Sequence, residues 1–214
     1  MLEEFHEENR HEMASGEVVN LVTEILDPNF KEGTISGVFS QDFVERRSYR
    51  RKMVEEAVTE EAPFWIKRFE DRIFLIVSAP SGAAGVKKLL TGNVANKLSE
   101  VLFSGRGSIV EMTISHATLK ELHESSPQAT RLIWFDNVDM PGVEKLCLAG
   151  SDLADTGLYH DYLEHGNIWY VVFEDPRRGI VVGITRRSVV TLFSKRTKDE
   201  FIKYISDDIL PLVE

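Results

Sequence analysis

Strand-like and helix-like segments follow one another in no regular order along this 214-residue sequence, and that order restricts the folds open to it. Residues 65–69 and 72–78 are consecutive β-rich runs, whereas other predicted strands stand alone between predicted helices. A doubly wound parallel sheet requires strands and helices to alternate regularly. We therefore predict an α+β fold, with a mixed, largely antiparallel sheet, packing helices and a C-terminal amphipathic helix.

Hydrophobic periodicity and turn residues predict the elements of this fold. Helices are expected over residues 17–26, 43–60, 86–102, 115–125, 155–165 and 197–210. Strands are expected over residues 33–39, 65–69, 72–78, 108–115, 129–135, 143–148, 167–173, 179–185 and 188–193. The apolar run 72–78 is typical of a central strand. The last three predicted strands are typical of an antiparallel meander. Thr197 and Glu200 predict a capping box at the start of the last helix.

The length and the 43% hydrophobic content suit a single core, which supports up to roughly 250 residues. We predict one α+β domain over residues 17–214. Residues 1–16 carry several glutamates and few large apolar groups, so we expect an acidic arm or a loosely attached helix. A short similarity between residues 38–40 and 192–194, each followed by a predicted helix, suggests two related halves that meet near residue 105.

Net charge and cysteine content restrict the partners and the compartment. The formal charge of -10 repels nucleic acid and anionic membranes unless basic residues gather locally. A single cysteine, Cys147, permits no internal disulfide. The chain opens Met1-Leu2-Glu3-Glu4, which is unlike a secretory signal, and its longest apolar run, residues 73–77, is too short for a membrane span. We expect a cytoplasmic protein without membrane contact.

Five cations stand among the seven residues 46–52 of this acidic chain. On the helix predicted from Phe43, at about 100° per residue, four of them fall within an arc of roughly 140° that also holds apolar residues. The four are Arg46, Arg47, Arg50 and Arg51. Lys52 lies on the opposite face of that helix. Guanidinium groups on an apolar face require carboxylates, phosphates or a partner protein, because an unpaired buried charge is costly.

The arginine cluster has more than one interpretation. The four arginines pair in cis with acids, including those of the acidic arm, or the helix starts later than predicted. Alternatively they bind an acidic protein surface or a phosphate-bearing ligand through bidentate contacts. Nucleic acid belongs to this second class but is disfavoured by the net charge, and a homo-oligomer is also compatible with the cluster.

Other candidate motifs are weaker. Residues 78–88 form a small-residue loop between a strand and a helix, but they lack the P-loop pattern and suit an ordinary tight turn. The histidines at positions 6 and 11 are spaced wrongly for one helix face. Four carboxylates next to predicted elements offer oxygen ligands for Mg²⁺, although turn and cap formation is their usual role; they are Asp136, Asp139, Asp152 and Asp155. Cys147 suits a small core residue.

These observations lead to two functional hypotheses. The first is a cytoplasmic, non-catalytic binding or regulatory protein that engages an acidic or phosphate-bearing partner through the arginine-rich segment. The alternative is a Mg²⁺-dependent enzyme acting on a phosphorylated substrate, with arginines on the phosphate and Asp136, Asp139 or Asp152 on the metal. The sequence contains no activated nucleophile motif, and we expect no cofactor for the first hypothesis.

Overall fold

The computed structural model describes residues 5–79 and 84–214. The chain divides into two compact units, Met1–Val110 and Glu111–Glu214. Each unit contains a five-stranded antiparallel sheet, with one helix in the described residues of the first unit and several in the second. This confirms the α+β class, although two sheets are present where we predicted one. The single domain over residues 17–214 and the kinship of two halves near residue 105 stay predictions. Among the helices of the described ranges, none combines the length and the apolarity that a membrane crossing requires.

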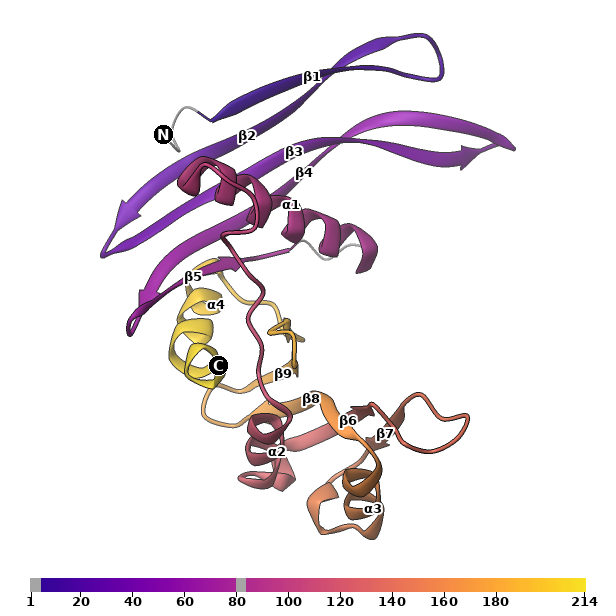
Figure 1. Ribbon diagram of the computed structural model, residues 1–214, viewed down its shortest axis with the longest axis vertical. Helices are drawn as coiled ribbons and strands as arrows, with labels where there is room; N and C mark the ends of the chain where they lie inside the picture. Colours follow the sequence, from indigo (N-terminus) through magenta and orange to yellow (C-terminus); the bar gives the residue numbers. More distant parts are fainter. Residues whose placement is uncertain (1–4, 80–83) are drawn as a thin grey trace. The chain divides into compact units, whose positions relative to one another are not determined.

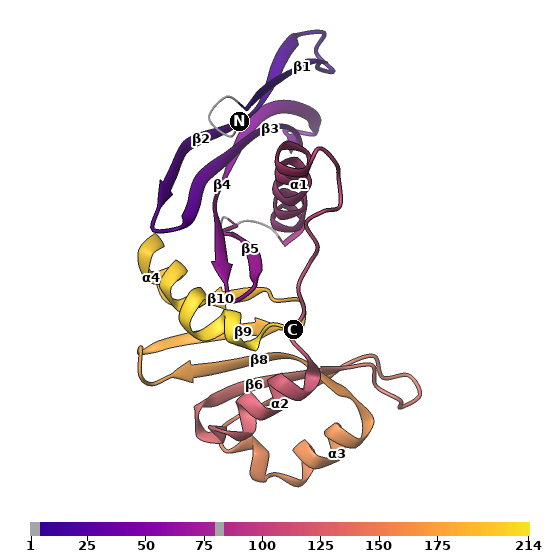
Figure 2. The same ribbon diagram turned by 60° about the vertical axis from the view of Figure 1, so that its left-hand side comes forward.

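The first unit is an antiparallel meander in which every strand pairs with the next along the chain (Figure 1). Its elements are β1 (His6–Glu12), β2 (Val18–Lys31), β3 (Thr34–Tyr49), β4 (Lys52–Phe69), β5 (Arg72–Val77) and α1 (Ala84–Phe103). Figure 2 shows α1 along one side of this sheet. The predicted helix after Pro80 and the predicted strand pair at 65–69 and 72–78 are therefore confirmed.

The core of the first unit lies between α1 and the sheet. Phe39 and Phe64 on neighbouring strands are fully buried against Val94 and Leu98 of α1. Gly37 makes room for this arrangement, because a Cβ atom there would lie 3.0 Å from the Phe64 ring. Full burial of such side chains stabilises the folded state by about 1.5–3 kcal/mol each.

Three elements predicted before residue 61 are wrong. The expected arm or helix at residues 1–16 contains β1, which pairs with β2 over its whole length, and the expected helix at 17–26 lies within β2. The expected helix at 43–60 forms the end of β3 and the start of β4. Val18, Val22, Ile25 and Val44 are β-branched and favour strands, while their spacing also fits the helical period. Pairing with a neighbouring strand decides between the two conformations.

Strand β5 is an edge strand, so the prediction that residues 72–78 form a central strand is wrong. Its apolar character has a different cause, since from Phe74 to Val77 the residues on both faces are buried or half-buried, although Ile73 is exposed. Leu75 and Val77 pack against the core cluster, and Phe74 and Ile76 on the other face are buried. Burial of two faces, and not a position between two strands, accounts for the apolar sequence.

The second unit has the strand order β10-β9-β8-β6-β7 (Figures 1 and 2). Its elements are α2 (His116–Glu124), β6 (Thr130–Asp136), β7 (Leu146–Ala149), α3 (Gly157–His165), β8 (Asn167–Asp175), β9 (Ile180–Thr185), β10 (Val190–Leu192) and α4 (Lys198–Tyr204). The predicted meander of the last three strands is confirmed. The strand predicted at 108–115 is wrong, because residues 108–109 form a bend and residues 110–115 have no regular secondary structure.

Side-chain caps fix the helix starts of the second unit. Ser115 accepts a hydrogen bond from the Thr118 N–H, and Thr197 with Glu200 forms the predicted capping box of α4. After α4 a π-helical turn, Ile205–Ile209, and a 3₁₀ turn, Leu210–Leu212, complete the C-terminal segment. Only Tyr204 is buried within α4, so the amphipathic character of the C-terminal helix stays a prediction.

Ion pairs attach this C-terminal segment to the turn between β8 and β9. Arg178 lies 3.2 Å from the Asp207 carboxylate and 2.6 Å from that of Asp208. Arg177 reaches Asp208 as well, at 3.2 Å. Further along, the Glu214 N–H donates to the Thr113 carbonyl at 3.1 Å. The final residues therefore have a fixed position beside α2.

A histidine is buried in the core of the second unit. His123 is fully buried, its Nδ1 lies 2.8 Å from the Thr130 hydroxyl, and its ring meets that of Tyr159 edge-on at 4.8 Å. The Nε2 atom has no hydrogen-bond partner among the described residues. Burial lowers the pKa of His123 below its ordinary value of 6.5, and the nearby Glu124 carboxylate opposes this only in part. The folded protein therefore holds this ring neutral.

The neutral His123 ring predicts a loss of stability in acid. Between its ordinary pKa and its lowered folded pKa the unfolded chain binds the proton and the folded chain does not, so stability falls as the pH drops below about 6.5. In urea unfolding between about pH 7.5 and about pH 5.5, His123→Gln should have a flatter stability profile than the wild type.

The exposed Gln128 supplies the control for this measurement, since Gln128→Ala removes no titratable group and should keep the wild-type slope. The half-buried His116, whose pKa is lowered by desolvation as well, contributes a slope common to all three proteins. Parallel profiles for the wild type and His123→Gln would show that His123 does not couple folding to protonation.

Candidate anion-binding site

The arginine-rich segment lies at the end of a two-stranded hairpin. Pairing between β2 and β3 stops at Thr23 and Gln41, whereas β3 and β4 stay paired as far as Tyr49 and Lys52 (Figure 1). The Asp42 carboxylate stands where β2 leaves β3. It accepts hydrogen bonds from the Val22 N–H at 2.9 Å and from the Thr59 hydroxyl at 2.6 Å, and so satisfies a backbone donor that the sheet leaves unpaired.

The hairpin turns at Arg50 and Arg51, and both residues have positive φ angles, 48° and 65°. Two consecutive left-handed residues are typical of a type I′ turn, which favours Asn-Gly. The turn between β2 and β3 has the same pattern with glycine in second place, at Glu32 and Gly33. An L-residue other than glycine in this conformation costs about 1 kcal/mol. The sequence therefore places two arginines where smaller residues fit with less strain.

Two of the four arginines pair in cis. The Arg46 Nε donates to Glu55 at 2.8 Å, and the Arg47 guanidinium lies 2.5 Å from the Glu56 carboxylate. Both partners belong to β4, and Arg46 and Glu55 face each other directly in the strand register. For Arg46 and Arg47 the structure thus shows the cis pairing that the sequence left open as one interpretation.

The cations at the turn are arranged differently. The Arg50 guanidinium lies over the Tyr49 ring at 5.5 Å from its centroid, and Arg51 and Lys52 are exposed. Within the described part of the chain, no ion pair joins Arg50, Arg51 or Lys52 to a carboxylate. Tyr49 and Met53 beside them are also exposed, at 58% and 68%. We call residues 49–53 the basic tip.

Lys52 belongs to this tip, so its predicted place on the opposite face of a helix from the four arginines is wrong. Strand pairing sets Lys52 directly across from Tyr49. The wrong placement results from applying the helical period to a strand. Residues that share one side of a helix, at about 100° per residue, alternate between the two faces of a strand. The helical arc that grouped the four arginines therefore has no counterpart in the structure.

Glu55 fixes the base of the hairpin. Its side chain is only 7% exposed, and besides Arg46 it accepts a hydrogen bond from the Ala14 N–H at 2.6 Å. The Ala14 N–H and the Arg46 guanidinium hold the pKa of the Glu55 carboxyl below its usual range. This carboxylate therefore joins the turn between β1 and β2 to the β3–β4 hairpin. Neither Glu55 nor Asp42 was identified from the sequence, which gives no signal for contacts at such separations.

The carboxylates proposed for Mg²⁺ have other partners. Both oxygens of Asp136 lie within 2.6 Å of the Arg186 guanidinium, and Asp139 lies 2.8 Å from His165 Nδ1. Asp152 has a left-handed turn conformation next to a short 3₁₀ helix. Across residues 5–79 and 84–214, no three His, Cys, Asp or Glu side chains are grouped so as to hold a metal ion. Asp136 and Asp139 thus act in ion pairs, and the Asp152 side chain makes no capping hydrogen bond, so the expected turn and cap role is seen only in the backbone conformation of Asp152.

The structure bears on two of three other sequence candidates. Residues 80–83 of the loop at 78–88 lie outside the described residues, so that interpretation stays a prediction. Cys147 is exposed on β7, so its assignment to the core is wrong. His6 lies on β1 and contacts the Glu8 and Glu24 carboxylates at 3.1 and 3.2 Å, which raises its pKa.

A scan against protein-family models finds no match, and a search of curated proteins finds none either. The candidate site therefore depends on its own geometry and charge.

Removal of the Glu55 carboxylate should release the β1–β2 turn from the hairpin. Glu55→Val keeps a strand-forming residue but deletes the acceptor of the Ala14 N–H, so hydrogen exchange at Ala14 should accelerate by about tenfold or more. Glu45→Val, which removes an exposed carboxylate one strand away, is the matched control and should leave Ala14 exchange unchanged. Equal exchange rates in all three proteins would exclude this role of Glu55.

Proposed function

We propose that this chain is a cytoplasmic, non-catalytic binding or regulatory protein that engages carboxylate- or phosphate-bearing partners through the basic tip. Strain and charge at one turn support this proposal. Arg50 and Arg51 occupy left-handed positions, and neither has an ion-pair partner among the described residues. Strained non-glycine residues are found preferentially at functional sites. The guanidinium group offers bidentate hydrogen bonds that match carboxylate and phosphate oxygens.

The surroundings of the tip help to define the partner. Glu55 and Glu56 neutralise Arg46 and Arg47, so the positive charge available to a partner is concentrated on three cations at the turn. The acidic composition of the rest of the chain disfavours a long polyanion that would follow the protein surface. A partner whose oxyanions reach the tip alone is compatible with both features. Exposed Tyr49 and Met53 offer apolar contact beside the charges, and tyrosine and arginine are enriched in protein interfaces.

Arg51→Gly separates binding from folding. Glycine accepts a positive φ without penalty, so the variant should be more stable by about 1 kcal/mol in urea unfolding. The lost guanidinium should weaken binding of a short polyanion that reaches the tip alone, either tetra-L-glutamate or inorganic tripolyphosphate, by about tenfold, the equivalent of about 1.4 kcal/mol. Binding is measured by calorimetry at about 50 mM and about 300 mM salt, and the higher salt should weaken it further.

The β2–β3 turn supplies the matched control. Glu32→Gly relieves the same backbone conformation and should stabilise the protein to a similar extent, but it should not weaken binding of either polyanion. Unchanged affinity in Arg51→Gly, or binding of the wild type that does not respond to salt, would contradict an anion site at the tip. Binding of only one polyanion would identify carboxylate or phosphate as the preferred group.

A further inference from the structure

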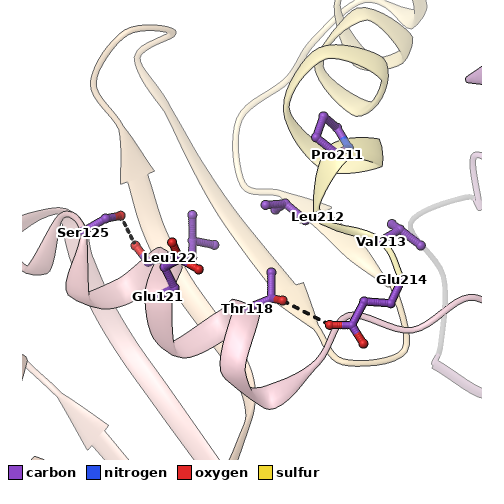
Figure 3. A pocket seen from close by; sticks show the side chains of 8 residues that line it. All are labelled: Thr118, Glu121, Leu122, Ser125, Pro211, Leu212, Val213 and Glu214. Carbon is purple, nitrogen blue, oxygen red and sulfur yellow. Dashed lines mark hydrogen bonds between the residues drawn. The ribbon is translucent and has the colours of Figure 1, made fainter. Parts of the chain in front are cut away.

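A second candidate binding site lies in the other unit, between α2 and the C-terminal segment (Figure 3). The cavity has a volume of about 440 Å³, which is within the range of small-molecule sites. Its lining residues are Thr118, Glu121, Leu122, Ser125, Pro211, Leu212, Val213 and Glu214. The ion pairs of Arg177 and Arg178 with the π-helical turn and the Glu214–Thr113 hydrogen bond fix the C-terminal wall.

The polar groups that line this pocket are hydrogen-bond acceptors or are already used as donors. The Thr118 hydroxyl donates to the Glu214 carboxylate at 3.4 Å, and the Ser125 hydroxyl donates to the Leu122 carbonyl at 3.0 Å (Figure 3). Glu121 and Glu214 add two carboxylates, and both residues are exposed. No basic side chain belongs to the lining residues. The pocket therefore has a negative potential and needs donors from a ligand.

The basic residue nearest in sequence to Glu121 does not neutralise it. Lys120 pairs with Glu124 one helical turn further along α2, at 3.6 Å. In the described residues, no ion pair joins Glu121 or the Glu214 side chain to a cation. An ammonium group beside either carboxylate would gain an ion pair while an attached carbon chain contacts Leu122, Leu212 and Pro211.

We propose that this pocket binds an organic ammonium ion with a short apolar body. The class includes a free alkylamine and the side chain of a lysine in a partner peptide, which present the same chemistry. Carboxylates at the mouth favour the cation over a neutral or anionic analogue, and the leucine and proline side chains favour a carbon chain over bare ammonium. The pocket would bind a cation, whereas the basic tip would bind an anion. The inference therefore does not depend on the proposed function.

The test compares three probes by NMR titration of amide signals from α2 and from residues 211–214. n-Hexylammonium should bind with a Kd on the order of 1 mM, and n-hexanol and ammonium chloride should each bind at least severalfold more weakly. An acetylated tripeptide with one central lysine distinguishes a peptide source from a free amine. Tighter binding of the peptide than of n-hexylammonium would identify a partner protein as the source of the amine, and the reverse order would identify a small molecule.

Charge removal at the mouth provides the second measurement. Glu121→Gln should raise the Kd of n-hexylammonium by about three- to fivefold, as expected for a partly exposed ion pair, and salt should weaken wild-type binding in the same direction. Glu164→Gln on α3, which also removes an exposed carboxylate, should leave the Kd unchanged. Equal binding of n-hexanol and n-hexylammonium would overturn the proposal, as would equal effects of the two substitutions.

Discussion

The unbroken antiparallel pairing of β3 with β4 supports both the core and the candidate site of the first unit. The register runs from Thr34 opposite Lys67 to Tyr49 opposite Lys52 without a shift. At one end it places Phe39 and Phe64 next to α1, and at the other end the two strands continue as a hairpin beyond the point where β2 stops pairing with β3. A single pair of long strands therefore anchors the unit and also carries five exposed residues to its tip.

Prediction from the sequence succeeded where local signals mark the element boundaries. In the second unit, Ser115 caps α2, Gly166 follows α3, and the capping box of Thr197 and Glu200 starts α4. Such signals act over a few residues and do not depend on distant contacts. The same reasoning found the tight turn between β4 and β5.

The long strands of the first unit were misread because they lack such signals. Residues 43–60 contain no glycine, and the turn inside them consists of two arginines, which no turn preference predicts. Their charged and apolar residues fit a helical period as well as a strand period. The strand interpretation is favoured by the pairing of Arg46 with Glu55 across the hairpin, and this pairing can be recognised only when the two strands are aligned. The cluster was therefore identified from the sequence, but its geometry and its cis partners were not.

Two carboxylates near the base of the hairpin have consequences for binding at its end. Asp42 holds β2, β3 and β4 together where the sheet divides, and Glu55 joins the β1–β2 turn to β4. A protruding two-stranded ribbon without such attachments is marginally stable in water. Because these contacts restrict the hairpin before a partner arrives, less conformational entropy is lost on association. The pairing of β3 with β4 on either side of the turn then maintains the left-handed conformations of Arg50 and Arg51. The same pairing keeps both guanidinium groups at the exposed end of the hairpin.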